Sequence, residues 1–397
     1  MKVLAIHNFH RKGSASGDDQ VFKSETKLLE CHGNEVIRYT VSNDEFDNSG
    51  LIGKILATLG MLWSLKNYNA VKRIIKIERP DIVHVHTFFP LLSPSILYAA
   101  KRSGAKVVVT LHDTRFVCPC STSLRGTELC NKYGDGKYFR MCKYGCFKNS
   151  KLQSFIVACI FYYHRLRKTF YTQIDHYICL NENQIKLLTD IGFENHKITK
   201  KYNFVPDAEA NIQAIKVDGL PARYVVFYGR IGIEKGIRQL MQIWEELPDI
   251  PLVVMGTGPL EEEFRIWADQ HKNVYFLGYT QHDICLSIVK GGEFVVFPSI
   301  WYEGCSMVEI ETESLGKALI ATDIGFSAEA IENGMNGYKV KLEDTQGFVD
   351  IIQYLWGDPD LTKKIGENAR KDYESKYLPE DNYNQLIKVY ENVEVRQ

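Results

Sequence analysis

Short apolar runs rich in Val and Ile recur along the 397-residue chain, separated by stretches of helix length. This alternation is typical of parallel β-strands joined by helical crossovers. In the first half we predict strands in KVLAIH, EVIRYTV, DIVHVH, KVVVTLH and HYICL. In the second half we predict them in YVVFYGR, PLVVMGTG, VYFLGY, EFVVFPS and ALIATDIG. The pattern therefore predicts two doubly wound α/β units, with ligands bound in a cleft at the carboxyl ends of the strands.

A polar segment from Asn203 to Arg223 carries two prolines and precedes a new strand. We interpret this segment as a linker, because the chain is long enough for two domains that each have a core. We expect an N-terminal domain over 1–205 and a C-terminal domain over 206–375. Residues 376–397 should form a C-terminal helix that packs back on the N-terminal domain.

Four glutamates crowd the stretch WYEGCSMVEIETESLGK, residues 301–317. Ser306 precedes Glu309 by three residues, the spacing of a capping box, which predicts that a helix begins there. At 100° per residue, Glu309 and Glu313 lie opposite the apolar side of this helix. We therefore expect these two carboxylates on a solvated face.

The other two glutamates are better candidates for binding. Glu311 falls within the apolar side of the helix, where a carboxylate costs several kcal/mol unless it meets hydrogen-bond donors. Glu303 lies just before the helix, whose N-terminus favours an anion. A carboxylate there is either structural or accepts hydrogen bonds from sugar hydroxyls beside N–H groups that hold a phosphate.

Two cations follow the first predicted strand of the second half, in FYGRIGIEKG. Arg230 ends the strand, and Lys235 follows a glycine-bearing loop. An arginine fork and a lysine point charge at the carboxyl end of a strand suit a diphosphate. The alternative is two surface cations of an ordinary βα loop.

Charge is distributed unevenly, although the formal net charge is only -1. Residues 1–205 hold 30 Lys and Arg against 17 Asp and Glu, whereas the remainder holds 18 against 32. The basic first half should attract phosphates or an anionic membrane surface. We expect no nucleic-acid partner, because no basic run or nucleic-acid-binding motif is present.

These motifs together resemble the family 4 glycosyltransferases of the GT-B fold, in which two Rossmann-like doubly wound domains face each other across a cleft. The likeness extends over essentially the whole chain. FLGYT, residues 276–280, stands where the family has its base-contacting loop. The matching positions are Glu303 and Glu311 for E-x7-E, and Gly229, Arg230 and Lys235 for G-R-x4-K.

The resemblance implies a retaining transfer of a sugar from a UDP- or GDP-linked donor, with no cofactor or catalytic metal required. It assigns the diphosphate to Arg230 and Lys235, the ribose hydroxyls to Glu311 and the donor sugar to Glu303. Further donor contacts are implied for Gly229, for Tyr279 and Thr280 at the base, and for the helix start at Gly304, Cys305, Ser306, Met307 and Val308.

The first half resembles a branch found among bacterial polysaccharide enzymes. The resemblance lies in SGDDQVF, RPDIVHVHTFFPLLSPS and TLHDTRFVCP. It implies a glycan acceptor, such as a lipid-linked precursor of a surface polysaccharide. The glycine pair usual after the first strand reads Ser16-Gly17 here, so that Gly17 is the candidate for donor contact. His112 matches the family histidine near the donor sugar and the reacting centre.

Two other functions are compatible with parts of this pattern. Paired carboxylates flank the scissile bond in glycoside hydrolases, but a neutral glycan would leave Arg230 and Lys235 unpaired. A sugar-nucleotide-binding protein without turnover would keep the donor pocket but would need nothing like His112.

Half of the ten cysteines lie in a loop-rich insertion near residues 115–150. Four of them could bind a structural zinc ion tetrahedrally, although the insertion has no C-x2-C pair. The alternative is a set of reduced loop thiols. The zinc candidates are Cys118, Cys130, Cys142 and Cys146.

The opening MKVLAIHNFH lacks the long apolar core of a signal peptide, and runs such as FIVACIFYY are too short to span a bilayer. We therefore expect a cytoplasmic protein whose cysteines are mostly reduced. The apolar segments 51–66 and 151–170 carry basic flanks. They suit either core helices or interfacial helices on the inner face of an anionic plasma membrane.

Overall fold

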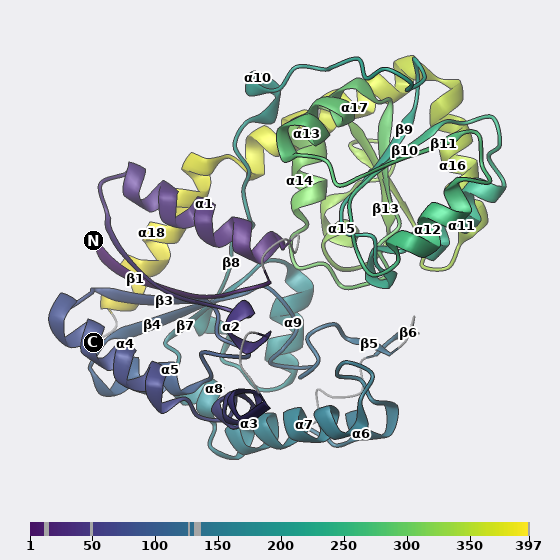
Figure 1. The fold of residues 1–397 in the computed structure, drawn as a ribbon. Coiled ribbons are helices and arrows are strands. Elements are labelled where there is room, and N and C mark those ends of the chain that lie inside the picture. The colour runs from purple at the N-terminus through teal and green to yellow at the C-terminus, as the bar shows by residue number, and fades with distance from the viewer. Residues whose placement is uncertain (12–15, 48–50, 126–127, 131–135, 396–397) are drawn as a thin grey trace. The chain divides into compact units, whose positions relative to one another are not determined.

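The chain forms two compact units (Figure 1). The first comprises Met1–Tyr202 together with Asn382–Gln397, and the second comprises Asn203–Asp381. The structure is a computed structural model that describes residues 1–11, 16–47, 51–125, 128–130 and 136–395.

The first unit contains a six-stranded parallel sheet with the order β2-β1-β3-β4-β7-β8. Every strand predicted for the first half is present. The edge strand β8 was missed, because three residues are too few to show a periodic pattern. The strands are β1 (Lys2–Phe9), β2 (Glu35–Ser42), β3 (Ile82–Thr87), β4 (Lys106–Leu111), β7 (His176–Cys179) and β8 (Ile198–Lys200).

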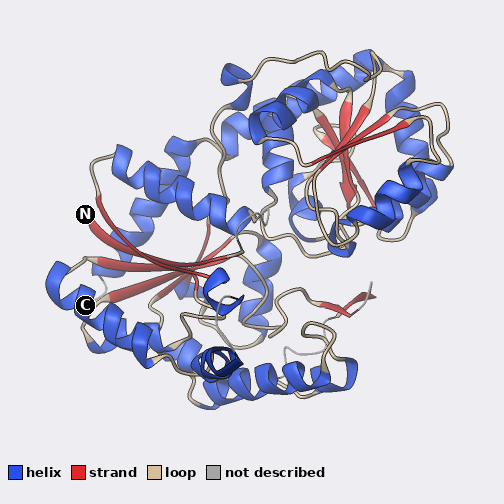
Figure 2. Ribbon diagram, in the orientation of Figure 1, coloured by secondary structure: helices blue, strands red, loops and turns tan. Residues whose placement is uncertain are grey.

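Helices cover both faces of this sheet, as Figure 2 shows. Adjacent strand residues point to opposite faces. Val3 therefore packs with α1 (Gly17–Cys31) and α18 (Pro379–Val395), whereas Leu4 joins the larger core on the other face. A short hairpin, β5 (Leu124–Arg125) and β6 (Glu128–Leu129), lies in the cysteine-bearing insertion. The helices are α1 (Gly17–Cys31), α2 (Asp44–Asp47), α3 (Leu51–Gly60), α4 (Leu65–Glu78), α5 (Ser95–Arg102), α6 (Arg140–Tyr144), α7 (Lys151–Leu166), α8 (Thr169–Thr172), α9 (Glu182–Asp190) and α18 (Pro379–Val395).

The second unit contains another six-stranded parallel sheet, with the order β11-β10-β9-β12-β13-β14. Every strand predicted for the second half is present, and β14 was missed because only its two ends are buried. The direction of winding reverses between β9 and β12. The strands are β9 (Val225–Tyr228), β10 (Leu252–Met255), β11 (Val274–Gly278), β12 (Phe294–Phe297), β13 (Ala318–Thr322) and β14 (Gly337–Val340).

The predicted linker begins as part of the second unit. The Tyr373 hydroxyl donates to the Val205 carbonyl at 2.9 Å, and Arg370 pairs with Asp207 at 2.7 Å. The helices of this unit are α10 (Ala208–Asn211), α11 (Ile237–Glu245), α12 (Glu261–Ala268), α13 (His282–Gly291), α14 (Met307–Ser314), α15 (Gly325–Ala330), α16 (Thr345–Gly357) and α17 (Pro359–Lys376).

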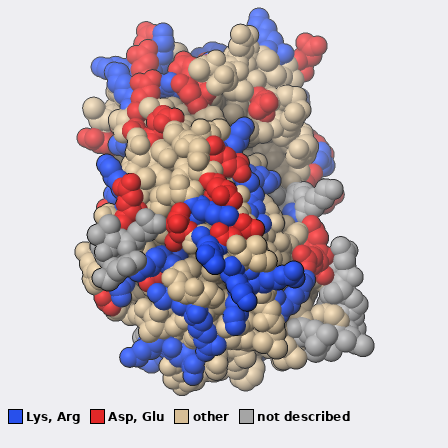
Figure 3. All heavy atoms as spheres, turned by 90° about the vertical axis from the view of Figure 1, so that its left-hand side faces the viewer, with Lys and Arg blue, Asp and Glu red and all other residues tan. Residues whose placement is uncertain are grey.

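The charge asymmetry of the sequence is visible on the surface of the first unit. Figure 3 shows Lys and Arg side chains gathered in the lower part of the view, which belongs to this unit. Helix α4 contributes exposed Lys72, Arg73 and Lys76. An extended basic surface of this kind attracts anionic partners.

Candidate active site

The candidate donor residues of the second unit lie at the reversal point of its sheet. Strands β9 and β12 are neighbours there, and the loops that follow them carry Lys235 and Glu303. In open parallel sheets this is the position where ligands bind. The strand order therefore brings together two residues that are 68 positions apart in sequence.

The loop after β9 fits closely against its neighbours because it contains glycines. Gly229 has φ 137° and Gly236 has φ 71°, values that favour glycine. A Cβ atom on Gly236 would overlap the carbonyl oxygen of Pro298, and one on Gly256 would overlap that of Gly229. The GTGP turn after β10, residues 256–259, therefore supports the loop that carries Arg230 and Lys235.

Lys235 and Glu303 form a close ion pair. Nζ of Lys235 lies 2.6 Å from Oε1 of Glu303, and the Ser299 hydroxyl donates to the same oxygen at 2.8 Å. The two side chains are 19% and 9% exposed. Nζ also lies 5.1 Å from the ring centre of Phe297 and 5.8 Å from that of Trp301. A cation is thus held at the sheet edge with its charge only partly screened by water.

The structure does not join all four predicted charged residues into one cluster. Nε of Arg230 lies 3.4 Å from Glu234, and the Arg230 side chain is 46% exposed. Oε1 of Glu311 lies 3.3 Å from Nε2 of His282, a residue on α13 that the sequence analysis missed. Burial raises the pKa of Glu311 to about 8. Hydrogen bonds from ligand hydroxyls would favour its ionised form.

Helix α14 begins where the capping spacing predicted. Ser306 is its N-cap, and the hydroxyl accepts from the Glu309 N–H at 3.4 Å. The buried Tyr228 hydroxyl donates to the Val308 carbonyl at 2.8 Å, which fixes the helix to β9. Cys305 is also buried, and its carbonyl accepts from Asn203 at 2.9 Å. The helix start, residues 304–308, is therefore held rigidly beside Glu303.

The expectation of a solvated face for Glu309 and Glu313 was wrong. Glu309 is 0% exposed and Glu313 is 2% exposed, because α14 packs against β13, α17 and the Ser327 side chain of α15. The Ser327 hydroxyl donates to Glu309 at 3.0 Å. Burial and the neighbouring Glu303 charge raise the pKa of Glu309 to about 8, and burial also raises that of Glu313. The angular positions of the residues predicted a single apolar side for this helix. They could not predict that other elements of the fold pack against its other sides as well.

The predicted base-contacting loop follows the carboxyl end of β11, which is separated from β9 by β10 in the sheet. Tyr279 is 79% exposed, and the hydroxyl of Thr280 donates to the Gly278 carbonyl at 3.4 Å. The Gly256 N–H also donates to Gly278, at 2.8 Å. This loop is thus connected through the GTGP turn to the loop that carries Arg230 and Lys235.

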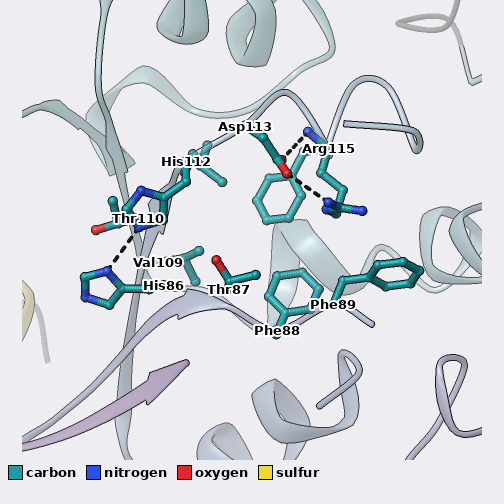
Figure 4. A pocket seen from close by; sticks show the side chains of 11 residues that line it. His86, Thr87, Phe88, Phe89, Val109, Thr110, His112, Asp113 and Arg115 are labelled. Atoms are coloured by element: carbon teal, nitrogen blue, oxygen red, sulfur yellow. Dashed lines mark hydrogen bonds and ion pairs between the residues drawn. The ribbon is translucent and has the colours of Figure 1, made fainter. Parts of the chain in front are cut away.

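His112 lines a pocket at the carboxyl ends of β3 and β4 in the first unit (Figure 4). Its Nε2 lies 3.1 Å from Nδ1 of His86, and its Nδ1 lies 4.0 Å from Asp18. Burial lowers the pKa of His112 to about 4, so the ring is neutral near pH 7. Asp113 and Arg115 form an ion pair at 2.9 Å on the pocket wall.

Gly17 is the first residue of α1, with Ser16 as its N-cap. The first turn of this helix contains the carboxylate of Asp19. This carboxylate lies 2.8 Å from His7 and 3.1 Å from His10. Hydrogen bonds from these two rings lower the pKa of Asp19. A donor phosphate at Gly17 would therefore lie near a carboxylate.

Several cysteines of the insertion lie close together. Cys120 interacts with Cys118 and Cys146; the contact between the first two lowers the pKa of Cys118 and raises that of Cys120. Among the described side chains, the cysteines form no group of three ligand atoms within 4.8 Å. Zinc bound by Cys118, Cys130, Cys142 and Cys146 stays a prediction for elemental analysis.

Helix α7 exposes an apolar stripe, defined here as Leu152, Phe155, Tyr162 and Leu166. These side chains are 70%, 51%, 42% and 66% exposed, and exposed Lys151, Arg167 and Lys168 flank them. The other side of α7 is buried in the core. In the segment 51–66, side chains 51, 52 and 54–56 lie outside the described residues. Of the helices that the structure describes, none is both long and apolar enough to cross a membrane.

The two units define a class of protein by their fold. Anabaena HepE, solved in complex with UDP, matches with a TM-score of 0.68 and 16% identity, over 99% of this chain and 100% of that chain. Two units that each contain a six-stranded parallel sheet are the GT-B architecture of glycosyltransferases.

Sequence comparisons then give the family. A family profile described as "Glycosyltransferase Family 4" matches residues 32–209, and one described as "Glycosyl transferases group 1" matches residues 210–372. Alpha-D-kanosaminyltransferase of Streptomyces kanamyceticus is 25% identical over 92% of this chain and 90% of that protein. O-antigen chain mannosyltransferase C of Escherichia coli is 23% identical over 98% of each. The chain belongs to glycosyltransferase family 4, and it is a glycosyltransferase with relatives in polysaccharide biosynthesis.

Proposed function

We propose that the protein moves a sugar from a nucleotide-diphosphate sugar to a glycan acceptor with retention of configuration. The Lys235–Glu303 pair at the reversal point carries this proposal. A cation held there can exchange its carboxylate partner for a diphosphate, and it then stabilises the negative charge that develops on the leaving group. Glu303, released from Lys235, accepts hydrogen bonds from the donor sugar.

The remaining donor contacts follow from the elements around this pair. Arg230 is exposed enough to turn from Glu234 toward a phosphate, and its planar fork suits two phosphate oxygens. The N-terminus of α14 adds N–H groups and a favourable dipole. Glu311 accepts from the ribose hydroxyls, and the main chain of Tyr279 and Thr280 meets the base.

The reaction requires neither a protein nucleophile nor a catalytic metal in this scheme. The acceptor oxygen attacks the anomeric carbon from the face that the diphosphate leaves, and the bond from this carbon to the leaving oxygen breaks. A non-bridging oxygen of the leaving phosphate takes the acceptor proton. Lys235 and Arg230 supply the positive charge that a metal ion supplies in other enzymes.

The test is transfer of radiolabelled sugar from UDP- and GDP-linked donors to a bacterial lipid extract. The UDP complex of the structural neighbour makes UDP-sugars the first donors to screen. Label that enters the lipid fraction only with a nucleotide donor supports the proposal. Sugar release from an oligosaccharide without nucleotide would instead indicate a hydrolase, and nucleotide-sugar binding without any turnover would indicate a sensor.

We further propose that the acceptor is a lipid-linked glycan and that α7 attaches the enzyme to an anionic membrane surface. Exposed aromatic and aliphatic side chains beside lysine and arginine are the composition of an interfacial helix. Each basic residue near an anionic surface contributes about 1 kcal/mol. Attachment through the first unit would keep a membrane-anchored acceptor near the enzyme.

Liposome flotation tests the attachment. Vesicles of phosphatidylglycerol and phosphatidylcholine should recruit the wild type at low salt, and the Phe155→Ser/Leu166→Ser variant should bind them at least tenfold less. Ile266→Ser is the matched control, because Ile266 is 56% exposed but lies on α12 of the second unit. Equal recovery of both variants with the vesicles would refute the role of α7.

A further inference from the structure

A chain of buried side chains connects the interior of the first unit to His112. Oε1 of Glu25, on α1, lies 3.1 Å from Nε2 of His86, on β3. Nδ1 of His86 lies 3.1 Å from Nε2 of His112, at the end of β4 (Figure 4). Glu25 and His86 are 1% and 4% exposed, and the His112 side chain is 3% exposed. The chain therefore lies almost entirely out of water.

The second carboxylate oxygen of Glu25, Oε2, has a charged partner that keeps Glu25 ionised. The Lys201 ammonium donates to Oε2 of Glu25 at 2.8 Å and to Asn382 of α18 at 2.9 Å. A buried carboxylate next to an ammonium is stabilised as the anion, and the pKa of Glu25 is lowered well below its ordinary value by Lys201 and the neighbouring rings. Oε1 therefore acts as an acceptor toward the two ring nitrogens that face it, Nε2 of His86 at 3.1 Å and Nδ1 of His84 at 3.3 Å.

The acceptor role of Glu25 determines which nitrogen of each of the two histidine rings carries the proton. With a proton on Nε2, facing Glu25, the His86 ring offers the lone pair of Nδ1 on its other side. That lone pair requires a donor from His112, whose Nε2 is the atom at 3.1 Å. Asp18 favours the opposite tautomer of His112, but it lies 4.0 Å from Nδ1, beyond hydrogen-bond distance. The nearer contact decides, and Nδ1 of His112 is left as an acceptor.

We propose that Glu25 and His86 are positioning residues that hold His112 as the Nε2–H tautomer, so that Nδ1 accepts a hydrogen bond from a hydroxyl of the bound sugar. This proposal rests on the proposed function for the role of His112 in the reaction. A carboxylate that orients a histidine through its far nitrogen is an established way of fixing a catalytic tautomer. Here the imidazole of His86 lies between the carboxylate of Glu25 and the ring of His112.

A metal ion is not needed to explain the Glu25 cluster. Glu25, His84 and His86 are the one group of three potential metal ligands within 4.8 Å among the described residues. Lys201 already supplies the positive charge at Glu25. Both ring nitrogens of His84 lie 2.8 Å from hydroxyls, those of Tyr390 and Thr110. The cluster is therefore a proton-ordered network that α18 helps to complete.

Long-range ¹⁵N–¹H NMR of histidine-labelled protein tests the tautomer without any activity measurement. His112→Gln identifies the His112 signals, which should show a protonated Nε2 and an unprotonated Nδ1 near pH 7. Glu25→Gln should shift them toward the Nδ1–H form. Glu30→Gln is the matched control on α1, because Glu30 pairs with Arg38 at the surface. An Nδ1–H tautomer in the wild type, or unchanged signals in Glu25→Gln, would overturn the proposal.

Kinetics separate this proposal from the proposed function. If the enzyme transfers sugar, Glu25→Gln should lower kcat at least tenfold with little change in KM for the nucleotide sugar, whereas Glu30→Gln should change neither. A parallel rise in KM would indicate general damage and contradict a positioning role. Absence of transfer with every donor would refute the proposed function, while the NMR result would still decide the tautomer.

Discussion

The Lys235–Glu303 ion pair predicts that neutralising its two members has opposite effects on nucleotide binding. In the free protein the two charged atoms lie 2.6 Å apart, so a diphosphate must displace the carboxylate in order to reach the lysine. Lys235→Met removes the phosphate contact and keeps an apolar stem beside Phe297. Glu303→Gln removes the competing carboxylate and leaves the ammonium available to the phosphate.

The magnitudes follow from the geometry of the pair. A hydrogen bond to a charged group contributes about 1.5–3 kcal/mol, and 1.4 kcal/mol corresponds to about tenfold in affinity, so Lys235→Met should weaken UDP binding roughly 10- to 100-fold. Surface ion pairs contribute about 0–1 kcal/mol. The Lys235–Glu303 pair is largely buried, so we expect its contribution to lie at the upper end of this range or above it. Removing its competition by Glu303→Gln should therefore strengthen UDP binding about fivefold or more.

Isothermal titration calorimetry with UDP, and with GDP in parallel, measures both effects. Arg238→Met is the control, since Arg238 pairs with Glu263 on an exposed part of the same unit and should bind UDP like the wild type. Circular dichroism confirms that each variant is folded. Unchanged affinity in Lys235→Met would refute the reasoning, and so would a Glu303→Gln variant that binds UDP as weakly as Lys235→Met.

Three further predictions concern the donor-side unit. Glu311→Gln should raise Tm at pH 8–9 but not below about pH 4: burial raises the folded pKa to about 8, whereas the unfolded carboxyl titrates near about 4.3. The folded state therefore binds more protons than the unfolded state between these values, and the wild type loses stability as pH rises. Thermal melts across this range check it, and a pH-independent difference would contradict it. Ser306→Ala should lower the free energy of unfolding by about 1 kcal/mol, measured by urea denaturation, because the helix loses its N-cap. Gly236→Ala should lower both Tm and UDP affinity, since its Cβ would overlap the Pro298 carbonyl and displace the loop after β9; wild-type values of both would show that the loop tolerates the change.

The sequence by itself determined the two-unit α/β fold and the start of α14. Buried parallel strands are continuous apolar runs, and a capping box is a contact over three residues, so both are local patterns. The short edge strands β8 and β14 were missed because their residues are mostly half-buried and show no such run. The motif positions were also visible, although their spacing alone could not say which of them touch.

Only the tertiary structure decided the contacts that give these residues their chemistry. Lys235 meets Glu303 because β9 and β12 are neighbours in the sheet, whereas Arg230 faces Glu234 and Glu311 faces His282. Helix periodicity predicts one apolar side, but α14 is enclosed by several elements, and this is why Glu309 and Glu313 are buried.

The Glu25–His86–His112 chain shows the same limit most clearly. Its members come from α1, from β3 and from the position just after β4, and no spacing in the sequence relates them. Which nitrogen of a histidine carries the proton depends on the partner across the ring, and that partner is known only once the strands are paired and the helix is packed on the sheet.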